Sequence, residues 1–146
     1  MPKPSVELPN IVTHTAHHRV GQADINHANY LAAVSVIPIA MRAQEELMEQ
    51  LGLDPESSET GMLMASSQVD YISESYLDDL LEINIYLVEL DDKSIDLFFR
   101  FRDSCSQREI ARIKIRMLFF DYLMRRVVAV PHELRNSLGS IAIGRN

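Results

Sequence analysis

Four of the five histidines lie near the start of the chain, where their spacing raises the possibility of a metal site. His14, His17 and His18 fall in the segment IVTHTAHHRV, and His27 lies in the polar text GQADINHANY that follows it. The first segment is rich in β-branched residues and free of glycine and proline, which favours a strand. Along a strand, His14 and His18 share one face while His17 points to the other, so these three cannot converge on one ion without help from elsewhere. We therefore expect no metal site, and His27 is either a site residue or an exposed turn histidine.

The composition predicts one folded domain. The chain has 146 residues, of which 47% are hydrophobic and 24% charged, which suits a single core and excludes a disordered protein. Its net charge of -7 repels phosphate backbones, so we expect no nucleic acid partner. A single cysteine, Cys105, excludes a disulfide framework, and we expect it to be inert in a turn. We find no signal-peptide core and no apolar run of about 20 residues, so we expect a cytoplasmic protein without membrane association.

A long helix is predicted in the first half of the chain. The apolar segment 31–51 ends before Gly52, a suitable helix stop, and its second half, RAQEELMEQL, consists of strong helix formers. Its first half, LAAVSVIPIA, is apolar on nearly all sides, which indicates a buried helix. Because Pro38 lacks a backbone N–H, it either kinks this helix or divides it into two pieces.

The rest of the chain alternates apolar and polar residues, as strands do. A strand is predicted at 62–71, and the alternation is strong at 81–88, 95–102 and 111–119. Short links join the last three segments, which predicts an antiparallel meander. The text PHELRNSL, which begins at Pro131, predicts a short terminal helix.

These elements predict an α+β fold in which a long antiparallel sheet wraps around one central helix. Residues 1–10 contain three prolines and no periodicity, so we expect an extended N-terminal arm there. Residues 11–138 would form a single domain and residues 139–146 a C-terminal tail. Long strands at a sheet edge invite pairing with a second copy, so a homodimer is expected.

Four stretches of text carry a resemblance to a known family. They are RVGQADIN at 19–26, RAQEELMEQLGL at 42–53, VDYISESYLDDLLEI at 69–83 and ARIKIRMLFFDYLMRRVVAVP at 111–131. The last one sets out, in the family's order, Phe120, Asp121, Tyr122, Arg125, Arg126 and Pro131. Together with the element order, this text resembles the hotdog-fold acyl-CoA thioesterases, specifically the 4-hydroxybenzoyl-CoA thioesterase-like branch.

The resemblance implies a tightly wrapped homodimer, often a dimer of dimers, with active sites at the subunit interface. There, water would attack the thioester of an acyl-CoA and release a free acid and coenzyme A, with no cofactor beyond the coenzyme A of the substrate. This chemistry needs a carboxylate as base or nucleophile and a backbone N–H at a helix start that holds the thioester oxygen.

The catalytic positions are where this sequence departs from its relatives. When the chain is aligned without gaps, residues 24–26 match, but Tyr30 replaces the family's histidine and Arg42 its helix glutamate. Ala33 and Val34 stand in place of its Asn-Asp pair.

A second register uses the text Asn-His-Ala-Asn-Tyr-Leu of other hotdog thioesterases, which residues 26–31 reproduce in full. In that register the family's loop aspartate falls on Val20, unless the loop is shortened and Asp24 replaces it. Neither register restores the whole set, and Asp24 is the best remaining carboxylate; the alternative is that it caps a turn. We therefore predict catalytic residues Asp24, Asn26 and His27 and substrate-binding residues Asn29, Tyr30, Arg125 and Arg126.

Basic side chains also line one face of the predicted strand 111–119, with two more beside them on the predicted strand 95–102. They either bind coenzyme A phosphates or balance acidic neighbours such as Glu82 and Asp96; the residues concerned are Arg100, Arg102, Arg112, Lys114 and Arg116.

Hydrolysis of an acyl-CoA thioester is the leading functional hypothesis. The alternative is a non-catalytic hotdog protein that binds an acyl-CoA or a similar thioester, because the helix glutamate is replaced by Arg42. A purely structural dimer, whose pocket is filled by its own side chains, is a third hypothesis.

Overall fold

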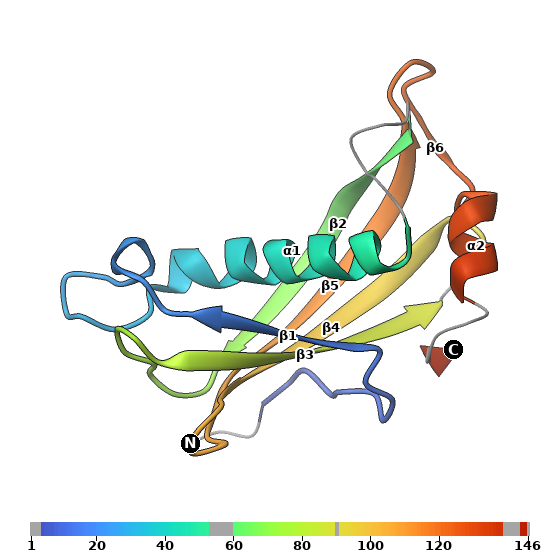
Figure 1. The fold of residues 1–146 in the computed structure, drawn as a ribbon. Coiled ribbons are helices and arrows are strands. Elements are labelled where there is room, and N and C mark those ends of the chain that lie inside the picture. The colour runs from blue at the N-terminus through green and yellow to red at the C-terminus, as the bar shows by residue number, and fades with distance from the viewer. Residues whose placement is uncertain (1–3, 53–59, 90, 139–143, 146) are drawn as a thin grey trace.

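The computed structural model describes residues 4–52, 60–89, 91–138 and 144–145, and one sheet dominates it (Figure 1). Its five long strands run in the order β1-β3-β4-β5-β2, with bounds β1 (His14–Arg19), β2 (Thr60–Tyr71), β3 (Leu80–Glu89), β4 (Ser94–Asp103) and β5 (Glu109–Asp121). Neighbouring strands in this order are antiparallel. Helix α1 (Ala33–Gln50) lies along one face, and the sheet curves around it. A 3-10 turn, η1 (Gln22–Asp24), precedes α1, and α2 (His132–Leu138) follows the sheet.

The core lies between α1 and the sheet. Apolar residues recur along α1 at intervals of three and four positions and are almost fully buried: Val36, Ile39, Ala40, Ala43 and Leu47. The alternate residues of β3, β4 and β5 meet this stripe, and Phe99 and Phe101 at the centre of β4 have no exposed surface. Burial of these two apolar faces, more than helix propensity, holds α1 in place.

Helix α1 is a single continuous helix, although Pro38 lies inside it. A proline in a helix interior removes one backbone hydrogen bond. Here Pro38 is exposed, while Val36 and Ile39 on either side of it are buried in the core. Packing of these neighbours on the sheet outweighs the lost bond, so the predicted division into two pieces does not occur.

Two short strands that the sequence pattern did not predict extend the sheet. Strand β6 (Arg126–Val128) pairs with β5, because the chain reverses after Asp121, whose carboxylate accepts the N–H groups of Leu123 and Met124, both at 2.9 Å. Strand β7 (Gly144–Arg145) runs parallel to β3 and lies in the segment predicted as a tail; residues 139–143 and 146 are outside the described residues. Strands of two or three residues are too short to show a period.

The N-terminal arm crosses the sheet face opposite α1. Val6 is buried, and its N–H donates to the Asp70 carboxylate at 2.6 Å while its carbonyl accepts from Arg112 at 3.1 Å. Further along, the N–H of Thr13 donates to the carbonyl of Ile85 at 2.7 Å. These bonds hold the arm at Val6 and the chain that follows the arm at Thr13, and β1 begins at residue 14 rather than at the predicted residue 11. None of the helices in the described ranges is long and apolar enough to cross a membrane.

Candidate active site

Asp24 closes the turn between β1 and α1. Its N–H donates to the carbonyl of Gly21 at 3.0 Å, and its Oδ2 accepts the N–H of Gly21 at 2.9 Å. Its own carbonyl accepts the N–H of Ala32, the residue before α1, at 2.9 Å. These bonds fix η1 against the start of α1, so the predicted turn-capping role of Asp24 is present in the structure.

The Asp24 carboxylate also contacts two cation-forming side chains from other elements. Its Oδ2 lies 2.8 Å from Nε2 of His18 on β1, and its Oδ1 lies 4.0 Å from Nη2 of Arg42 on α1. The exposed fractions of the Asp24 and His18 side chains are 14% and 23%. Burial alone would raise the pKa of Asp24, but the hydrogen bonds from Gly21 and His18, together with the positive charge of Arg42, lower this pKa below its usual value. Asp24 is therefore ionised at neutral pH.

The ionised carboxylate determines how His18 is protonated at this contact. A carboxylate only accepts hydrogen bonds, so Nε2 of His18 must carry the hydrogen that it donates to Asp24. The other ring nitrogen, Nδ1, is then held in a fixed orientation. A carboxylate and an imidazole in contact are groups that can position water and move a proton.

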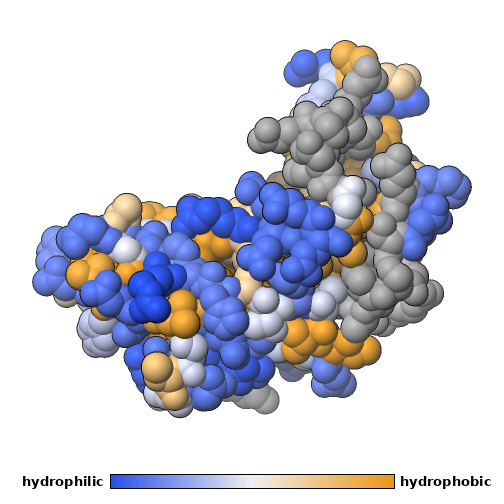
Figure 2. All heavy atoms as spheres, in the orientation of Figure 1, coloured by the Kyte–Doolittle hydropathy of each residue, from blue (hydrophilic) through white to orange (hydrophobic). Residues whose placement is uncertain are grey.

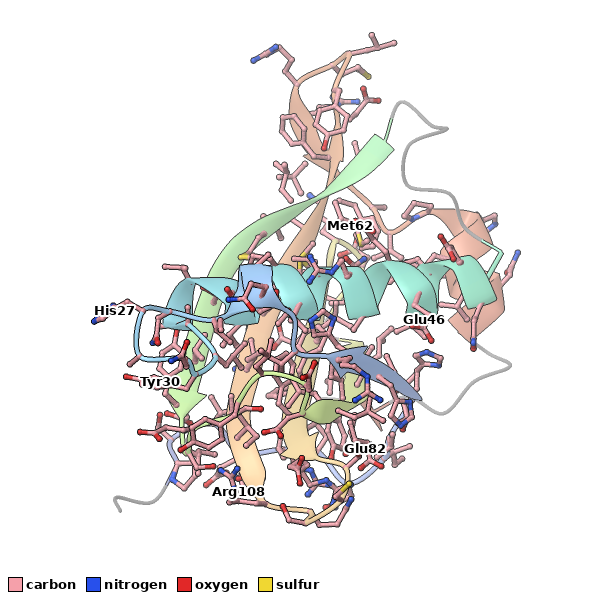
Figure 3. The ribbon with its side chains drawn as sticks, turned by 60° about the vertical axis from the view of Figure 1, so that its left-hand side comes forward. His27, Tyr30, Glu46, Met62, Glu82 and Arg108 are labelled. Atoms are coloured by element: carbon pink, nitrogen blue, oxygen red, sulfur yellow. The ribbon has the colours of Figure 1, made fainter. Side chains whose placement is uncertain are left out.

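The predicted neighbours of Asp24 form a turn of their own. The Oδ1 atom of Asn26 accepts the N–H groups of Ala28 at 2.9 Å and Tyr30 at 3.4 Å, and Asn29 has a φ angle of 67°. His27 lies at the tip of this turn, exposed and pointing away from α1, and Tyr30 lies nearby, half-buried (Figure 3). Asn26 thus shapes the turn, whereas the hydrogen bonds to Asp24 come from His18 and Gly21.

Arg125 and Arg126, predicted to contact the substrate, lie at the other end of the molecule. Both are exposed in the β5–β6 hairpin, which projects beyond α1 on the side away from η1 (Figure 1). A single chain therefore does not bring them to Asp24.

Four of the five basic residues singled out on β4 and β5 are paired with acids on the sheet face opposite α1, and the fifth, Arg100, donates to the amide oxygen of Asn84 at 3.4 Å. Arg116 donates to Asp96 at 3.0 Å, and Lys114 lies 3.8 Å from the same carboxylate. Arg112 donates to Glu109 at 2.9 Å, and Arg102 pairs with Glu82. This pattern agrees with the alternative in which these residues balance acidic neighbours.

The histidines of β1 occupy the faces that the alternation predicts. His14 and His18 both turn toward α1, where His14 lies 3.0 Å from Glu46, while His17 is exposed. Among the described residues, no group of three His, Cys, Asp or Glu side chains is placed to hold a metal ion.

Two partners of Asp24 had no site role in the sequence-based prediction. His18 precedes Asp24 by six residues, across a turn, and Arg42 comes from the middle of α1. Strand alternation indicates which face His18 occupies, but only the fold of η1 back onto β1 brings Asp24 to it.

The start of α1 is open at the surface near this turn. The side chain of Val34, in the first helical turn, is 84% exposed. The first N–H groups of a helix have no partner within the helix and attract negative charge. The N–H groups of Ala32 and Ser35 already have acceptors, the carbonyls of Asp24 and Ala32, so the N–H groups of Ala33 and Val34 are the donors that this helix start can present next to the turn that holds Asp24.

Comparisons with known proteins agree on one fold. The chain aligns with solved structures of the 1,4-dihydroxy-2-naphthoyl-CoA thioesterase Slr0204 from Synechocystis (14% identity, 87% of this chain and 96% of that one, TM-score 0.82). It also aligns with the protein SAV2348 from Staphylococcus aureus in complex with CoA (17% identity, 91% of this chain and 87% of that one, TM-score 0.80). A third alignment is with the PA5185 protein from Pseudomonas aeruginosa (23% identity, 92% of this chain and 95% of that one, TM-score 0.80). These likenesses confirm the predicted hotdog fold.

The sequence itself also matches a family model. A search of curated protein sequences finds no significant match. The family model described as the thioesterase-like superfamily, however, matches residues 20–138, which include η1, α1 and the long strands from β2 to β5. The chain therefore belongs to the thioesterase-like superfamily.

Proposed function

We propose that this protein hydrolyses the thioester of an acyl-CoA, with Asp24 as the carboxylate of the site. The observation that carries the proposal is the ionised Asp24, hydrogen-bonded to His18 and fixed beside the start of α1, in a chain of the thioesterase-like superfamily. Two structural relatives support the choice of substrate class. The one from Synechocystis is a CoA thioesterase, and SAV2348 was solved in complex with CoA.

In the proposed reaction, the thioester carbonyl lies at the start of α1. A backbone N–H of the first turn holds the oxygen as it becomes negative. Asp24 either accepts a proton from the attacking water, which gives the free acid directly, or attacks the carbonyl carbon itself, which gives an acyl-aspartate anhydride that water then hydrolyses to the free acid and the Asp24 carboxylate. Both routes break the C–S bond and release coenzyme A as a thiolate that takes up a proton. His18 keeps the carboxylate oriented, and Asn26, His27, Asn29 and Tyr30 form the adjacent turn over which the acyl-CoA would lie.

The proposal includes a homodimer, because one edge of the sheet is open. Strand β2 ends the sheet among the described strands, and Leu63 and Met64 on it are 38% and 40% exposed. A long and partly apolar edge strand favours pairing with a second copy. Two such dimers could also associate as a tetramer.

Release of free coenzyme A tests the proposed activity. Short-chain, long-chain and aromatic acyl-CoAs are incubated with the wild type and with Asp24→Asn, and the free thiol is measured with a thiol-reactive dye. Loss of proton transfer by a positioned carboxylate should lower turnover by about 100-fold or more. Glu45→Gln, at an exposed position of α1, is the matched control and should leave turnover unchanged. Equal turnover by the wild type and Asp24→Asn would refute the role of Asp24.

A second candidate function is binding of an acyl-CoA without hydrolysis. One observation favours it: the Asp24 carboxylate already accepts bonds from Gly21 and His18 and faces Arg42, and its lowered pKa makes it a weak base. Calorimetric titration that shows tight binding of an acyl-CoA without thiol release would support this function. Turnover of the same acyl-CoA would exclude it.

A further inference from the structure

One oxygen of the Asp24 carboxylate is left open to a substrate. Its Oδ2 accepts the N–H of Gly21 and contacts Nε2 of His18, whereas Oδ1 accepts no hydrogen bond from any residue that the structure describes. The charged group that faces Oδ1 is the Arg42 guanidinium, whose Nη2 lies 4.0 Å away. The oxygen that can act on a thioester therefore lies beside an arginine.

The guanidinium of Arg42 has donors to spare. A guanidinium carries several N–H donors in a planar fork, and the 4.0 Å contact with Asp24 is too long for a hydrogen bond. Within the described ranges of the chain Arg42 makes no hydrogen bond and no second ion pair, and its side chain is 55% exposed. It is also the only basic residue of α1. An arginine with an open fork thus lies at the candidate site.

One exposed side of α1 leads from the helix start to Arg42. Residues four apart lie on the same side of a helix, and Val34, Pro38 and Arg42 follow this spacing with exposed side chains. Beyond them, Figure 2 shows hydrophilic surface over the second half of α1, where the exposed acids are Glu45, Glu46 and Glu49. A chain that runs along this side would pass two apolar residues and meet Arg42 before it reaches the acids.

The short distance between Arg42 and Asp24 decides which anionic group of an acyl-CoA can reach the guanidinium. In the proposed reaction the thioester carbon lies against Oδ1 of Asp24, so only groups close to the thioester come near Arg42. The phosphates of coenzyme A are separated from the thioester by the whole uncharged pantetheine arm. A negative group at Arg42 must therefore belong to the acyl part. The guanidinium fork matches a carboxylate through two parallel hydrogen bonds.

We infer that Arg42 binds a carboxylate at the end of a short acyl group, so the preferred substrate is a coenzyme A monothioester of a dicarboxylic acid. This inference rests on the proposed function, because it uses the acyl-CoA site at Asp24. Arg42 would also offset the repulsion between the Asp24 carboxylate and the carboxylate of the substrate. An uncharged acyl group would leave the guanidinium with only its long contact to Asp24.

The rate ratio of two matched substrates tests the inference. Succinyl-CoA and butyryl-CoA have acyl groups with the same number of carbons, and only the first ends in a carboxylate. In the wild type, kcat/KM should be higher for succinyl-CoA by about tenfold or more, as a hydrogen bond between charged groups predicts. Arg42→Gln should abolish this preference, and Arg42→Lys, which keeps the charge but not the fork, should retain part of it.

Two features make this ratio specific to the acyl carboxylate. Both substrates use the same Asp24, so the ratio cancels any effect of Arg42 on that side chain. Lys93→Gln is the matched control, because it removes one exposed positive charge in the β3–β4 turn and should keep the wild-type ratio. Both replaced side chains are exposed, so the variants should fold, and circular dichroism checks this. An Arg42→Gln variant with the wild-type ratio would overturn the inference.

Thioesters without phosphates distinguish the acyl carboxylate from the other anionic part of the substrate. Succinyl-pantetheine and butyryl-pantetheine lack the phosphates of coenzyme A, and we expect the same preference and the same loss in Arg42→Gln. If Arg42 bound a phosphate, its substitution would weaken both coenzyme A thioesters equally and leave both pantetheine thioesters unchanged. That result would overturn the inference.

Binding of thioethers separates the inference from the proposed hydrolysis. The carboxypropyl and butyl thioethers of coenzyme A cannot be hydrolysed, and calorimetric titration gives their dissociation constants. The carboxypropyl thioether should bind the wild type about tenfold tighter or more, and Arg42→Gln should bind the two alike. This preference without thiol release from any thioester would overturn the hydrolysis and retain the role of Arg42. Thiol release from butyryl-CoA, with no preference in either measurement, would retain the hydrolysis and overturn the role of Arg42.

Discussion

Replacement of Asp24 should separate its role as a turn cap from its role as a charge. Its Oδ2 accepts hydrogen bonds from the Gly21 N–H at 2.9 Å and from Nε2 of His18 at 2.8 Å. A hydrogen bond to a charged group contributes about 1.5–3 kcal/mol net, and partial exposure of this pair places the value near the lower end. Asp24→Ala removes both bonds and should lower the free energy of unfolding by about 3 kcal/mol. Asp24→Asn keeps an amide oxygen that can accept one of them and should cost about 1 kcal/mol.

A double-mutant cycle with His18→Ala isolates the contact between the two side chains. The coupling free energy should be about 1–2 kcal/mol, because the singly substituted proteins each lose the same hydrogen bond. The assay is urea denaturation followed by circular dichroism at pH 7, with each variant's slope compared with that of the wild type. Coupling near zero would refute the inference that this bond holds the carboxylate.

The same variants make a prediction about pH. The pKa of Asp24 is lowered in the folded protein, so the unfolded chain takes up a proton first, near the ordinary aspartate pKa of about 3.9. The stabilisation by the Asp24 charge is therefore complete above this pH and is lost as the pH falls through the folded-state pKa. The stability difference between the wild type and Asp24→Asn should be smaller at pH 3 than at pH 5. An equal difference at both values would contradict the reasoning.

Three further predictions concern the fold. Phe99→Ala removes a side chain with no exposed surface and should lower the free energy of unfolding by about 3–5 kcal/mol. Urea denaturation measures this loss as a lower midpoint, and an unchanged midpoint would argue against the core described above. Asp70→Ala removes the acceptor that holds the N-terminal arm, so limited proteolysis should cleave within residues 4–10 faster than in the wild type, with cleavage elsewhere as the internal control. Gly61→Ala places a Cβ 2.5 Å from the ring of Tyr122 and should lower the melting temperature. Adding Tyr122→Ala to this variant should restore much of the lost melting temperature. A melting temperature unaffected by Gly61→Ala would show that the ring moves freely.

Much of the fold could be predicted from local pattern. The alternation of Ile83, Ile85 and Leu87 places these residues on one strand face, and the structure buries each of them. The apolar spacing in α1 is likewise a property of neighbouring residues, and it predicts which face meets the sheet. The continuity of α1 through Pro38 was less predictable, because whether a lost hydrogen bond breaks a helix depends on the packing around it.

The candidate site was only partly predictable, because its contacts, like the effect of Pro38, depend on how separate elements pack. The sequence identified Asp24 as the carboxylate of a polar turn and Asn26 to Tyr30 as its surroundings. It could not show that His18 would donate to that carboxylate or that Arg42 would approach it, since these contacts join residues on three different elements.

By itself, then, the sequence determined the period of α1 and of the long strands, and the family text that includes Asp24. The tertiary structure decided which side chains surround that carboxylate, how the arm is fastened through Asp70 across the sheet, and that Arg125 and Arg126 lie far from Asp24 within one chain. Periodicity records how a residue sits relative to its neighbours in sequence. Contacts between distant segments depend on how the sheet curves around α1, and no local pattern encodes that curvature.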